Sequence, residues 1–368
     1  MKKPTHRLDL WVFFLRDMKK VIVTGGCGFI GSHTVVELQQ QGYTVVIADN
    51  LSNSLASVVD SIEKISGQRP VFEQVDLSSR QACLQFFSIH SDADAVIHFA
   101  AAKAVGESVR VPLHYYRNNI DSLLNVLEGM EKSDCRMLVF SSSCTVYGQP
   151  KKLPVTEKTP RLAANCPYGN TKQIAEDILT DLVHSYRVRA AAKEPVGKPW
   201  KMLALRYFNP IGAHPSGLIG ELPNGVPSNL MPFITQTAAG IREKLMVFGN
   251  DYNTPDGTPI RDYIHVCDLA AAHVCALQHM EKGDFEGLDF FNIGTGCGYS
   301  VLDVIKSFER STGCKLNYEI AERREGDIEQ IWANAEKAEK VLGWKASRTL
   351  DEMTRSAWKW QQNLQGKI

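Results

Sequence analysis

Short apolar runs rich in β-branched residues alternate with longer amphipathic segments between about residues 19 and 189. In the longer segments the apolar residues recur at helical spacing, whereas the short runs are typical of buried strands. We expect strands at residues 20–24, 44–48, 70–75, 94–99 and 136–141, and helices near residues 29–41, 55–66, 79–90, 112–131 and 169–187. Strands that alternate with helices predict a doubly wound parallel sheet, which is an α/β fold of the Rossmann type.

The pattern changes after residue 190. A polar segment at 193–200 precedes a strand at 201–207, and residues 209–232 are rich in Pro, Gly and Asn with little periodicity. A long irregular segment inside a compact protein usually forms a binding loop or a lid. We expect later helices near residues 230–243, 267–282, 300–312, 334–341 and 350–363, and strands near residues 245–248 and 289–293. This half therefore predicts a smaller mixed α/β region that binds a substrate.

A glycine-rich loop joins the first predicted strand to the first predicted helix, with glycines at positions 25, 28 and 31. Such glycines allow a tight turn, a close approach of the backbone to a pyrophosphate, and close packing of the helix on the strand. The next strand ends at Asp49, where an acid can hold the ribose hydroxyls of NAD and repel the 2′-phosphate of NADP. We therefore expect a site for NAD.

Tyr168 and Lys172 stand four residues apart at the start of a predicted helix, so their side chains share one face. A phenol has a pKa near 10 and is a poor base at neutral pH, but a neighbouring cation lowers that pKa. Lys172 is expected to do this while also holding the nicotinamide ribose. Alone, such a pair is most often accidental. Together with the glycine loop and the serines at 141–143, it indicates a general base.

Composition excludes several other classes of protein. The chain has 368 residues, 44% of them hydrophobic, and a formal net charge of 0, which favours neither nucleic acid nor an anionic membrane as a partner. Nine scattered cysteines without a C-x-x-C pair indicate reduced thiols in the cytoplasm, not a disulfide framework or a zinc site. His265 and His273 lack the spacing of metal ligands, so no metal is expected, and His98 is expected to be a packed core histidine.

The beginning of the chain is expected to stand apart from the fold. Residues 1–17 are partly apolar, but Asp9 interrupts the apolar stretch and no small-residue cleavage site follows. We therefore expect a dispensable extension at residues 1–17, an NAD-binding domain at residues 18–190 that later segments rejoin, and a mainly substrate-binding region at residues 191–368.

The glycine loop, Asp49, Ser143 and the Tyr168–Lys172 pair resemble the extended short-chain dehydrogenase/reductase family. Further segments are similar to the UDP-glucose 4-epimerases within it, namely residues 49–54, 98–108, 141–148, 205–214, 229–232, 248–252, 261–266 and 323–327. The resemblance implies that Tyr168 removes the proton of the sugar 4-hydroxyl while hydride passes from C4 to NAD+, with Ser143 relaying the proton. The 4-keto sugar would then rotate and take the hydride back on its other face, so that UDP-galactose and UDP-glucose interconvert without net oxidation. It also implies a homodimer.

The resemblance implies a set of site residues. Besides the catalytic Tyr168, Lys172 and Ser143, which also touch the cofactor, the expected cofactor-binding residues are Gly25, Gly28, Phe29, Ile30, Gly31, Asp49, Asn50, Asn53, Ser54, Asp76, Leu77, Phe99, Ala100, Ala101, Lys103, Asn118 and Phe208. The expected substrate-binding residues are Lys103, Ser143, Tyr168, Asn209, Asn229, Leu230, Val247, Phe248, Arg261, Arg324, Asp327 and Ile331, with the two arginines clamping the diphosphate.

Related enzymes leave alternatives open. Sugar-nucleotide dehydratases carry Thr-Asp-Glu where this chain has Ser143-Cys144-Thr145, so the acid and base for elimination are absent. Ile331 is smaller than the tyrosine frequent at this position and larger than cysteine, so exchange of UDP-GlcNAc and UDP-GalNAc is an alternative. A non-catalytic NAD(H)-binding regulator is a remote alternative, because Tyr168, Lys172 and Ser143 are all present. A simple reductase would show net turnover of added cofactor.

Overall fold

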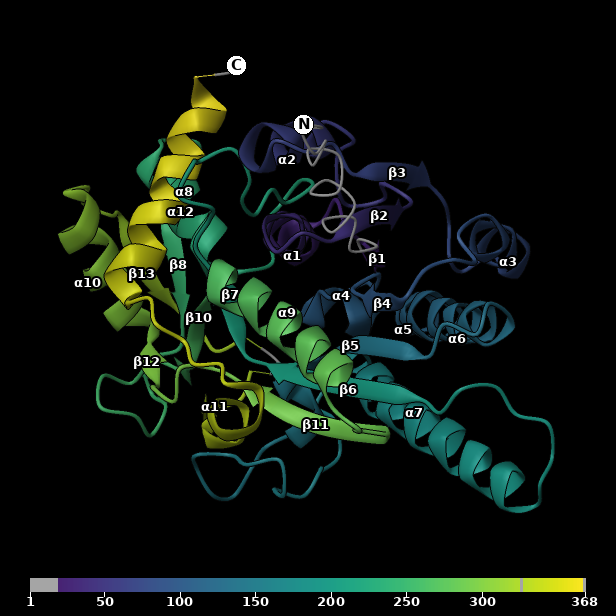
Figure 1. Cartoon of the computed structure of the whole chain (residues 1–368). Helices are drawn as coiled ribbons and strands as arrows, with labels where there is room; N and C mark the ends of the chain where they lie inside the picture. The colour runs from purple at the N-terminus through teal and green to yellow at the C-terminus, as the bar shows by residue number, and fades with distance from the viewer. Residues whose placement is uncertain (1–18, 325–326, 367–368) are drawn as a thin grey trace, which may run out of the picture.

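A seven-stranded sheet forms the centre of the computed structural model, which describes residues 19–324 and 327–366 (Figure 1). The expected extension at residues 1–17 lies outside these ranges. The strands of the large sheet are β1 (Lys20–Thr24), β2 (Thr44–Asp49), β3 (Val71–Gln74), β4 (Ala95–His98), β5 (Met137–Ser143), β6 (Lys201–Tyr207) and β11 (Gly287–Ile293). They run parallel in the order β11-β6-β5-β4-β1-β2-β3. The predicted Rossmann-type sheet is confirmed, and β6 and β11 join it from after residue 191.

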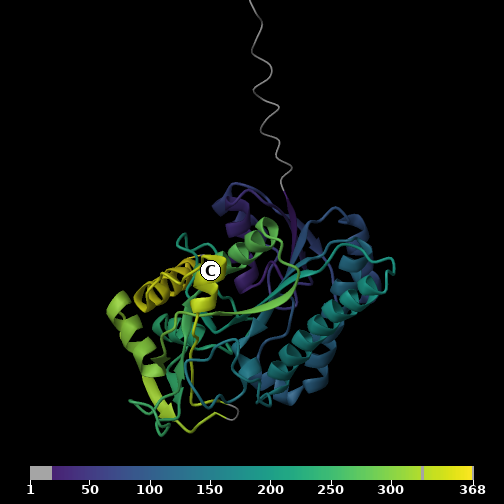
Figure 2. The same cartoon turned by 60° about the horizontal axis from the view of Figure 1, so that its bottom comes forward.

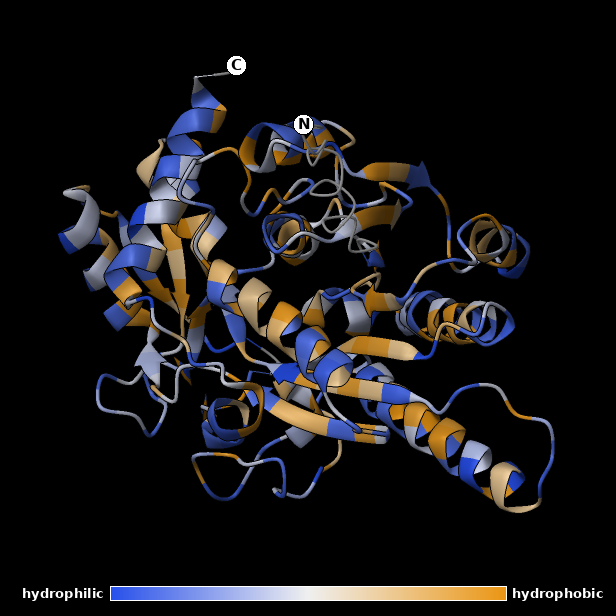
Figure 3. Cartoon of the chain, in the orientation of Figure 1, coloured by the Kyte–Doolittle hydropathy of each residue, from blue (hydrophilic) through white to orange (hydrophobic). Residues whose placement is uncertain are grey.

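Helices cover both faces of this sheet, because its strands carry apolar side chains on both faces. Val21 and Val23 face one core, whereas Ile22 between them faces the other. The first core is closed by α1 (Phe29–Gln40), α2 (Val58–Ser66) and α9 (Val266–Lys282), and the second by α3 (Arg80–Ile89), α6 (Ser122–Lys132) and α7 (Pro167–Ala191). The two layers of helices are seen from another side in Figure 2, and hydrophobic residues run along the strands in Figure 3.

A smaller mixed α/β region lies beside the sheet and has its own core. Its helices are α8 (Leu230–Ala238), α10 (Val301–Thr312) and α12 (Leu350–Gln365), and α11 (Glu336–Leu342) returns to the large sheet. Its short strands are β7 (Asn209–Ile211), β8 (Leu245–Phe248), β9 (Ile260–Arg261), β10 (Tyr263–His265), β12 (Tyr299–Ser300), β13 (Tyr318–Ala321) and β14 (Gln330–Ile331). They form the small sheets β10-β7, β12-β9-β14 and β13-β8.

Several sequence predictions were wrong in detail. The helix expected at residues 112–131 is α5 (Pro112–Tyr116), a π-helical turn (Arg117–Asp121) and α6. The helix expected to reach residue 243 ends at Ala238, because Gly240 adopts a φ of +72°. Helix α4 (Val105–Arg110) and most of the two- to four-residue strands were missed, since strands this short carry no periodicity.

The polar segment at 193–200 is mostly exposed, but its last residue is buried. Trp200 is buried, and the guanidinium of Arg136 lies 4.5 Å from the centre of its ring. An aromatic ring over a guanidinium is a favourable contact. The indole therefore attaches the end of this segment to the sheet at the start of β5.

A buried ion pair joins α7 to β6. Glu176 and Arg206 are 1% and 5% exposed in their side chains, with Arg206 Nη2 2.7 Å from Glu176 Oε2 and Arg206 Nε 2.8 Å from Oε1. Ser142 Oγ donates to the same carboxylate at 2.6 Å. The carboxylate therefore holds the helix that carries Tyr168 against the strand that carries Ser142.

Replacing Glu176 by Ala is expected to destabilise the protein by about 3–5 kcal/mol, because the guanidinium of Arg206 would stay buried without its counter-charge. The free energy of unfolding from urea titration checks this. The control is Glu336→Ala, which breaks an exposed pair with Lys340 and should change that free energy by no more than about 0.5 kcal/mol. Equal effects of the two substitutions would contradict the structural role of Glu176.

Candidate active site at the carboxyl edge of the sheet

The glycine loop between β1 and α1 is as tight as the sequence predicted. Gly25 has a φ of +69°, and its N–H donates to Ala48 O at 2.8 Å. A Cβ on Gly31 would lie 2.2 Å from Gly25 O, and one on Gly25 would lie 2.9 Å from Ala100 N. Gly28, the N-cap of α1, has no side chain to cap the helix, so the N–H groups at Phe29 and Ile30 are placed for an anion.

Asp49 lies beside this loop at the end of β2. Its Oδ2 accepts from Cys27 N at 3.0 Å, and its Oδ1 accepts from Leu51 N and Ser54 Oγ, both at 2.9 Å. The carboxylate therefore joins the glycine loop to the segment that carries Asn50, Asn53 and Ser54. A carboxylate oxygen has lone pairs for more than one donor, so this arrangement leaves capacity for ribose hydroxyls.

The end of β3 carries the next pair of expected cofactor residues. Asp76 Oδ1 accepts from Ser78 N at 3.0 Å, and Leu77 is buried with its carbonyl oxygen accepting from Asn125 Nδ2 at 2.9 Å. Asn125 of α6 therefore fixes the turn that presents these two residues.

The loop after β4 is held by a residue that the sequence analysis missed. Asn119 accepts from Ala102 N at 2.8 Å and donates to Ala102 O at 3.0 Å, and Asn118 Nδ2 donates to Asn119 Oδ1 at 3.0 Å. Both asparagines lie in the π-helical turn, a feature often found at functional sites. The turn thus supports the segment formed by Phe99, Ala100, Ala101 and Lys103. A neighbouring pair of asparagines inside an expected helix was the only signal in the sequence.

The proposed catalytic residues come together between β5 and α7. Tyr168, Lys172 and Ser143 are 9%, 4% and 7% exposed. Lys172 Nζ donates to Ser141 O at 2.6 Å and lies 5.9 Å from the centre of the Tyr168 ring. Burial lowers the pKa of Lys172 to about 8.

The expected lowering of the Tyr168 pKa by Lys172 is not seen in the protein alone. Burial raises the pKa of Tyr168 above its usual range, the nearby Tyr207 phenol adds to the rise, and a hydrogen bond with Ser143 opposes it. The physical reason is that Lys172 directs its ammonium at a backbone carbonyl and is itself desolvated. Tyr207, which shares a hydrogen bond with Ser141, is a further residue that the sequence analysis missed.

Phe208 and Asn209 follow β6, directly beside this cluster. Phe208 is buried in one small apolar cluster that also contains Ile331 and Cys144, the residue that follows Ser143. The backbone N–H of Asn209 donates to Asp262 O at 3.0 Å. The segment 207–209 therefore lies between the catalytic residues and the smaller region.

The structure brings together the two arginines that were expected to clamp the diphosphate. Arg324 makes two contacts with Asp327, at 2.8 and 3.1 Å, and Arg261 Nη2 lies 3.9 Å from the same carboxylate. Arg261 also donates to Ile328 O at 2.7 Å. One carboxylate thus gathers two guanidinium groups from segments far apart in the sequence.

The remaining expected substrate residues lie on the smaller region. Asn229 and Leu230 stand at the start of α8, and Val247 and Phe248 end β8. Phe248 is 40% exposed, whereas Val247 is buried in the core of this region. The side chain of Val247 is therefore committed to packing, and only its backbone is left for a ligand.

His98 fits its expected role as a core histidine, because its buried ring bonds Thr24 Oγ1 at 2.8 Å. Within the part of the chain that the structure describes, no three His, Cys, Asp or Glu side chains come together to hold a metal ion. None of the helices in the described ranges combines the length and apolar character needed to span a bilayer.

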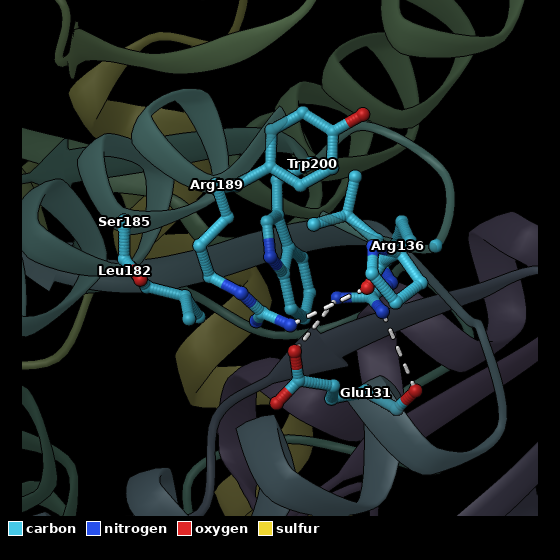
Figure 4. Close-up of a pocket in the computed structure, with 10 residues that line it drawn as sticks. Glu131, Arg136, Leu182, Ser185, Arg189 and Trp200 are labelled. Atoms are coloured by element: carbon cyan, nitrogen blue, oxygen red, sulfur yellow. Dashed lines mark hydrogen bonds and ion pairs between the residues drawn. The ribbon is translucent and has the colours of Figure 1, made fainter. Parts of the chain in front are cut away.

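A cavity of about 340 Å³ lies away from this edge, between α6, α7 and the segment at 193–200 (Figure 4). Its charged residues already have partners: Arg136 contacts Glu131 of the same lining at 3.5 Å, and Arg189 contacts Glu194, which lies outside the lining, at 3.2 Å. The lining also includes no residue expected at the active site. This cavity is thus separate from the candidate site at the carboxyl edge of the sheet, which is where ligands bind in open α/β folds.

Comparison with known proteins gives relatives over nearly the whole chain. The family model described as GDP-mannose 4,6 dehydratase matches residues 22–357. UDP-glucose 4-epimerase from Bacillus subtilis (strain 168) is 49% identical, over 93% of this chain and 96% of its own, and that from Dictyostelium discoideum is 49% identical, over 93% and 95%.

Solved structures agree with these relatives. The crystal structure of UDP-glucose 4-epimerase from Stenotrophomonas maltophila, with bound NAD and formylated UDP-arabinopyranose, has a TM-score of 0.88 at 48% identity and covers 95% of this chain and 100% of its own. The enzyme from Bifidobacterium longum in complex with NAD+ and UDP also has a TM-score of 0.88, at 45% identity and with the same coverage. The chain belongs to the UDP-glucose 4-epimerase family of extended short-chain dehydrogenase/reductases.

Proposed function

We propose that this protein interconverts UDP-galactose and UDP-glucose with a tightly held NAD. The observation that carries the proposal is the burial of Tyr168, Lys172 and Ser143 together at the carboxyl edge of the sheet, beside a glycine loop and an acid at the end of β2. Relatives of known structure contain NAD and UDP or a UDP-sugar. The residues at the ends of β1 to β6 fit a dinucleotide, because they combine a helix N-terminus, Asp49 and close backbone approach.

Tyr168 is proposed to take the proton of the sugar 4-hydroxyl and Ser143 to orient that oxygen. Because burial raises the pKa of Tyr168, the phenolate needs positive charge beside it. NAD+ supplies this charge together with the hydride acceptor when it is bound. Lys172 keeps a second positive charge nearby and is placed to hold the nicotinamide ribose. Arg261 and Arg324 hold the diphosphate, so the keto sugar can rotate about its link to UDP while the nucleotide stays bound.

The same proposal gives each half of the chain a function and the protein a compartment. Residues 18–190, rejoined by β6 and β11, form the NAD-binding domain, and residues 191–368 form mainly the UDP-sugar-binding region. The cytoplasm is the proposed compartment, because the cysteines of the described chain are all unpaired, which is usual where thiols stay reduced.

Purified protein without added NAD is expected to convert UDP-galactose to UDP-glucose, because each cycle regenerates the cofactor. Tyr168→Phe should keep its fold and bound NAD but lose at least about 100-fold in kcat, the usual contribution of a general base. Chromatography of the nucleotide sugars measures both. Tyr318→Phe, at an exposed tyrosine, is the control with full activity. A fully active Tyr168→Phe would refute the role of this phenol, and net consumption of cofactor would indicate a reductase.

A second candidate activity is exchange of UDP-GlcNAc and UDP-GalNAc. It rests on Ile331, which is buried in the same apolar cluster as Cys144 and Phe208, and which we propose lies near the sugar. A larger side chain there leaves less room for an N-acetyl group.

Ile331→Tyr is expected to reduce any conversion of UDP-GlcNAc by at least about tenfold, the scale on which a pocket rejects added bulk. Conversion of UDP-galactose should be retained. Both rates are measured with the same enzyme sample. Ile331→Val is the matched control, because it keeps an aliphatic side chain and should spare both activities. Equal losses with the two sugars would show that Ile331 does not act as a size gate.

We propose that the protein is a homodimer. Exposed apolar side chains gather along the consecutive helices α4 to α6: Val109 is 53% exposed, Val111 44%, Leu113 78% and Leu124 46%. Exposed apolar side chains that form a patch are typical of a protein–protein contact. A second copy is the proposed occupant, because an isologous contact needs only one self-complementary surface.

Leu113→Asp is expected to convert the dimer to a monomer, because two copies of an unpaired carboxylate would be buried in the contact. Light scattering after size-exclusion chromatography measures the mass. Leu222→Asp, on the irregular segment and also exposed, is the control that should stay dimeric. A wild-type protein of monomeric mass would refute the proposal.

A further inference from the structure

Glu221 links the two sides of the proposed active site, although the sequence analysis did not single it out. It lies in the irregular segment between β7 and α8. Its Oε1 accepts from Lys103 Nζ at 3.1 Å and from Asn229 Nδ2 at 2.5 Å. Lys103 comes from the loop after β4, and Asn229 begins α8. One carboxylate oxygen therefore joins a residue of the cofactor side to a residue of the substrate side.

The backbone of Glu221 is held from outside its own loop. Glu221 O accepts from Trp360 Nε1 of α12 at 3.0 Å, and a Cβ on Gly220 would lie 2.5 Å from the Trp360 ring. Asn363 Nδ2 of the same helix donates to Gly217 O at 2.9 Å. The last helix thus fixes the position of this segment, which gives the carboxylate a rigid support.

Burial makes the contact with Lys103 important for the carboxylate. The Glu221 side chain is 12% exposed, and its Oε2 has no hydrogen-bond partner among the described residues. Burying a carboxylate without a counter-charge costs free energy. The Lys103 ammonium is therefore more stable beside this carboxylate than extended into solvent. Lys103 is 40% exposed and has three N–H donors, so it can keep this contact and still donate to a phosphate oxygen.

Asn229, like Lys103, directs its side chain at the Glu221 carboxylate. It is the N-cap residue of α8, a position where asparagine usually accepts a hydrogen bond from the helix backbone. Here its side chain makes no capping bond, and its amide donates to Glu221. Its orientation is therefore set by the carboxylate and not by the helix that it begins.

We propose that Glu221 is a positioning residue that holds Lys103 and Asn229 in the orientation in which they meet the UDP-sugar. This inference rests on the proposed function and adds to it a residue that acts through its two neighbours. The carboxylate acts mainly through Lys103, because that contact carries the opposite charge.

The test is a double-mutant cycle on the protein with its bound cofactor, using Glu221→Gln and Lys103→Met. Glu221→Gln keeps the shape and an oxygen for Asn229 but removes the charge. We expect it to weaken UDP-glucose binding roughly tenfold by calorimetry, as one partly buried charge-assisted contact would, with kcat for UDP-galactose changed by less than about twofold. In the Lys103→Met background the same substitution should have little further effect. Glu319→Gln, which breaks the exposed pair with Lys244, is the matched control.

Two results would overturn the proposal: unchanged binding in Glu221→Gln, or an equal loss in both backgrounds, which a purely structural role predicts. Thermal unfolding of each variant checks the fold. If Glu221→Gln fails to fold, Glu221→Asp replaces it in the cycle, because it keeps the charge but withdraws it by one methylene. Calorimetry does not require turnover. A wild type that binds UDP-glucose without converting UDP-galactose would therefore count against the proposed epimerase activity alone.

Discussion

The close approach of the backbone to itself at Gly25 and Gly31 is the constraint on which the rest of the site depends. A Cβ on Gly31 would overlap Gly25 O, and a Cβ on Gly25 would press on Ala100 N. The glycine loop, the start of α1 and the end of β4 therefore meet with no side chain between them. This contact leaves the N-terminus of α1 open and brings Asp49 to the same edge, where its carboxylate bonds the loop.

Burial then decides what the chemical groups on this edge can do. Tyr168 and Lys172 are both desolvated, and in each case burial favours the uncharged form: the pKa of the phenol rises and that of the amine falls to about 8. The protein alone thus resists forming a phenolate. Ionisation of Tyr168 would become favourable with positive charge beside it, so under the proposed function proton removal would be coupled to the presence of the oxidised cofactor. Such coupling suits a reaction in which proton and hydride leave the sugar together.

The large sheet could be predicted from the sequence because its signals are local. Buried strands such as 20–24 and 44–48 are continuous apolar runs, and the glycine spacing marks the turn between strand and helix. The small strands β9 and β14 could not be predicted, because two residues have no period and their pairing joins segments about 70 residues apart. The π-helical turn at Arg117–Asp121 was hidden inside a good helical pattern, and its Asn119 bonds Ala102, which lies outside that pattern.

The residues of the candidate site likewise fall into those with a local sequence signal and those whose contacts are distant in the sequence. Gly25, Asp49 and the Tyr168–Lys172 pair could be found from spacing, whereas Asn229, Arg324 and Ile331 entered only through resemblance to a family. Asn119, Tyr207 and Glu221 were missed, because each acts on a segment far away in the sequence: Asn119 on Ala102, Tyr207 on Ser141, and Glu221 on Lys103.

The irregular segment between β7 and α8 shows why such residues escape sequence analysis. Its composition predicts a binding loop or a lid, yet its carbonyl groups at residues 217 and 221 accept hydrogen bonds from α12, about 140 residues further on. Order in a segment without periodicity must come from partners elsewhere, since backbone groups need hydrogen bonds whatever the local pattern. A segment of this kind can therefore present a side chain as firmly as a helix does, and the helix that supports it is then part of the site.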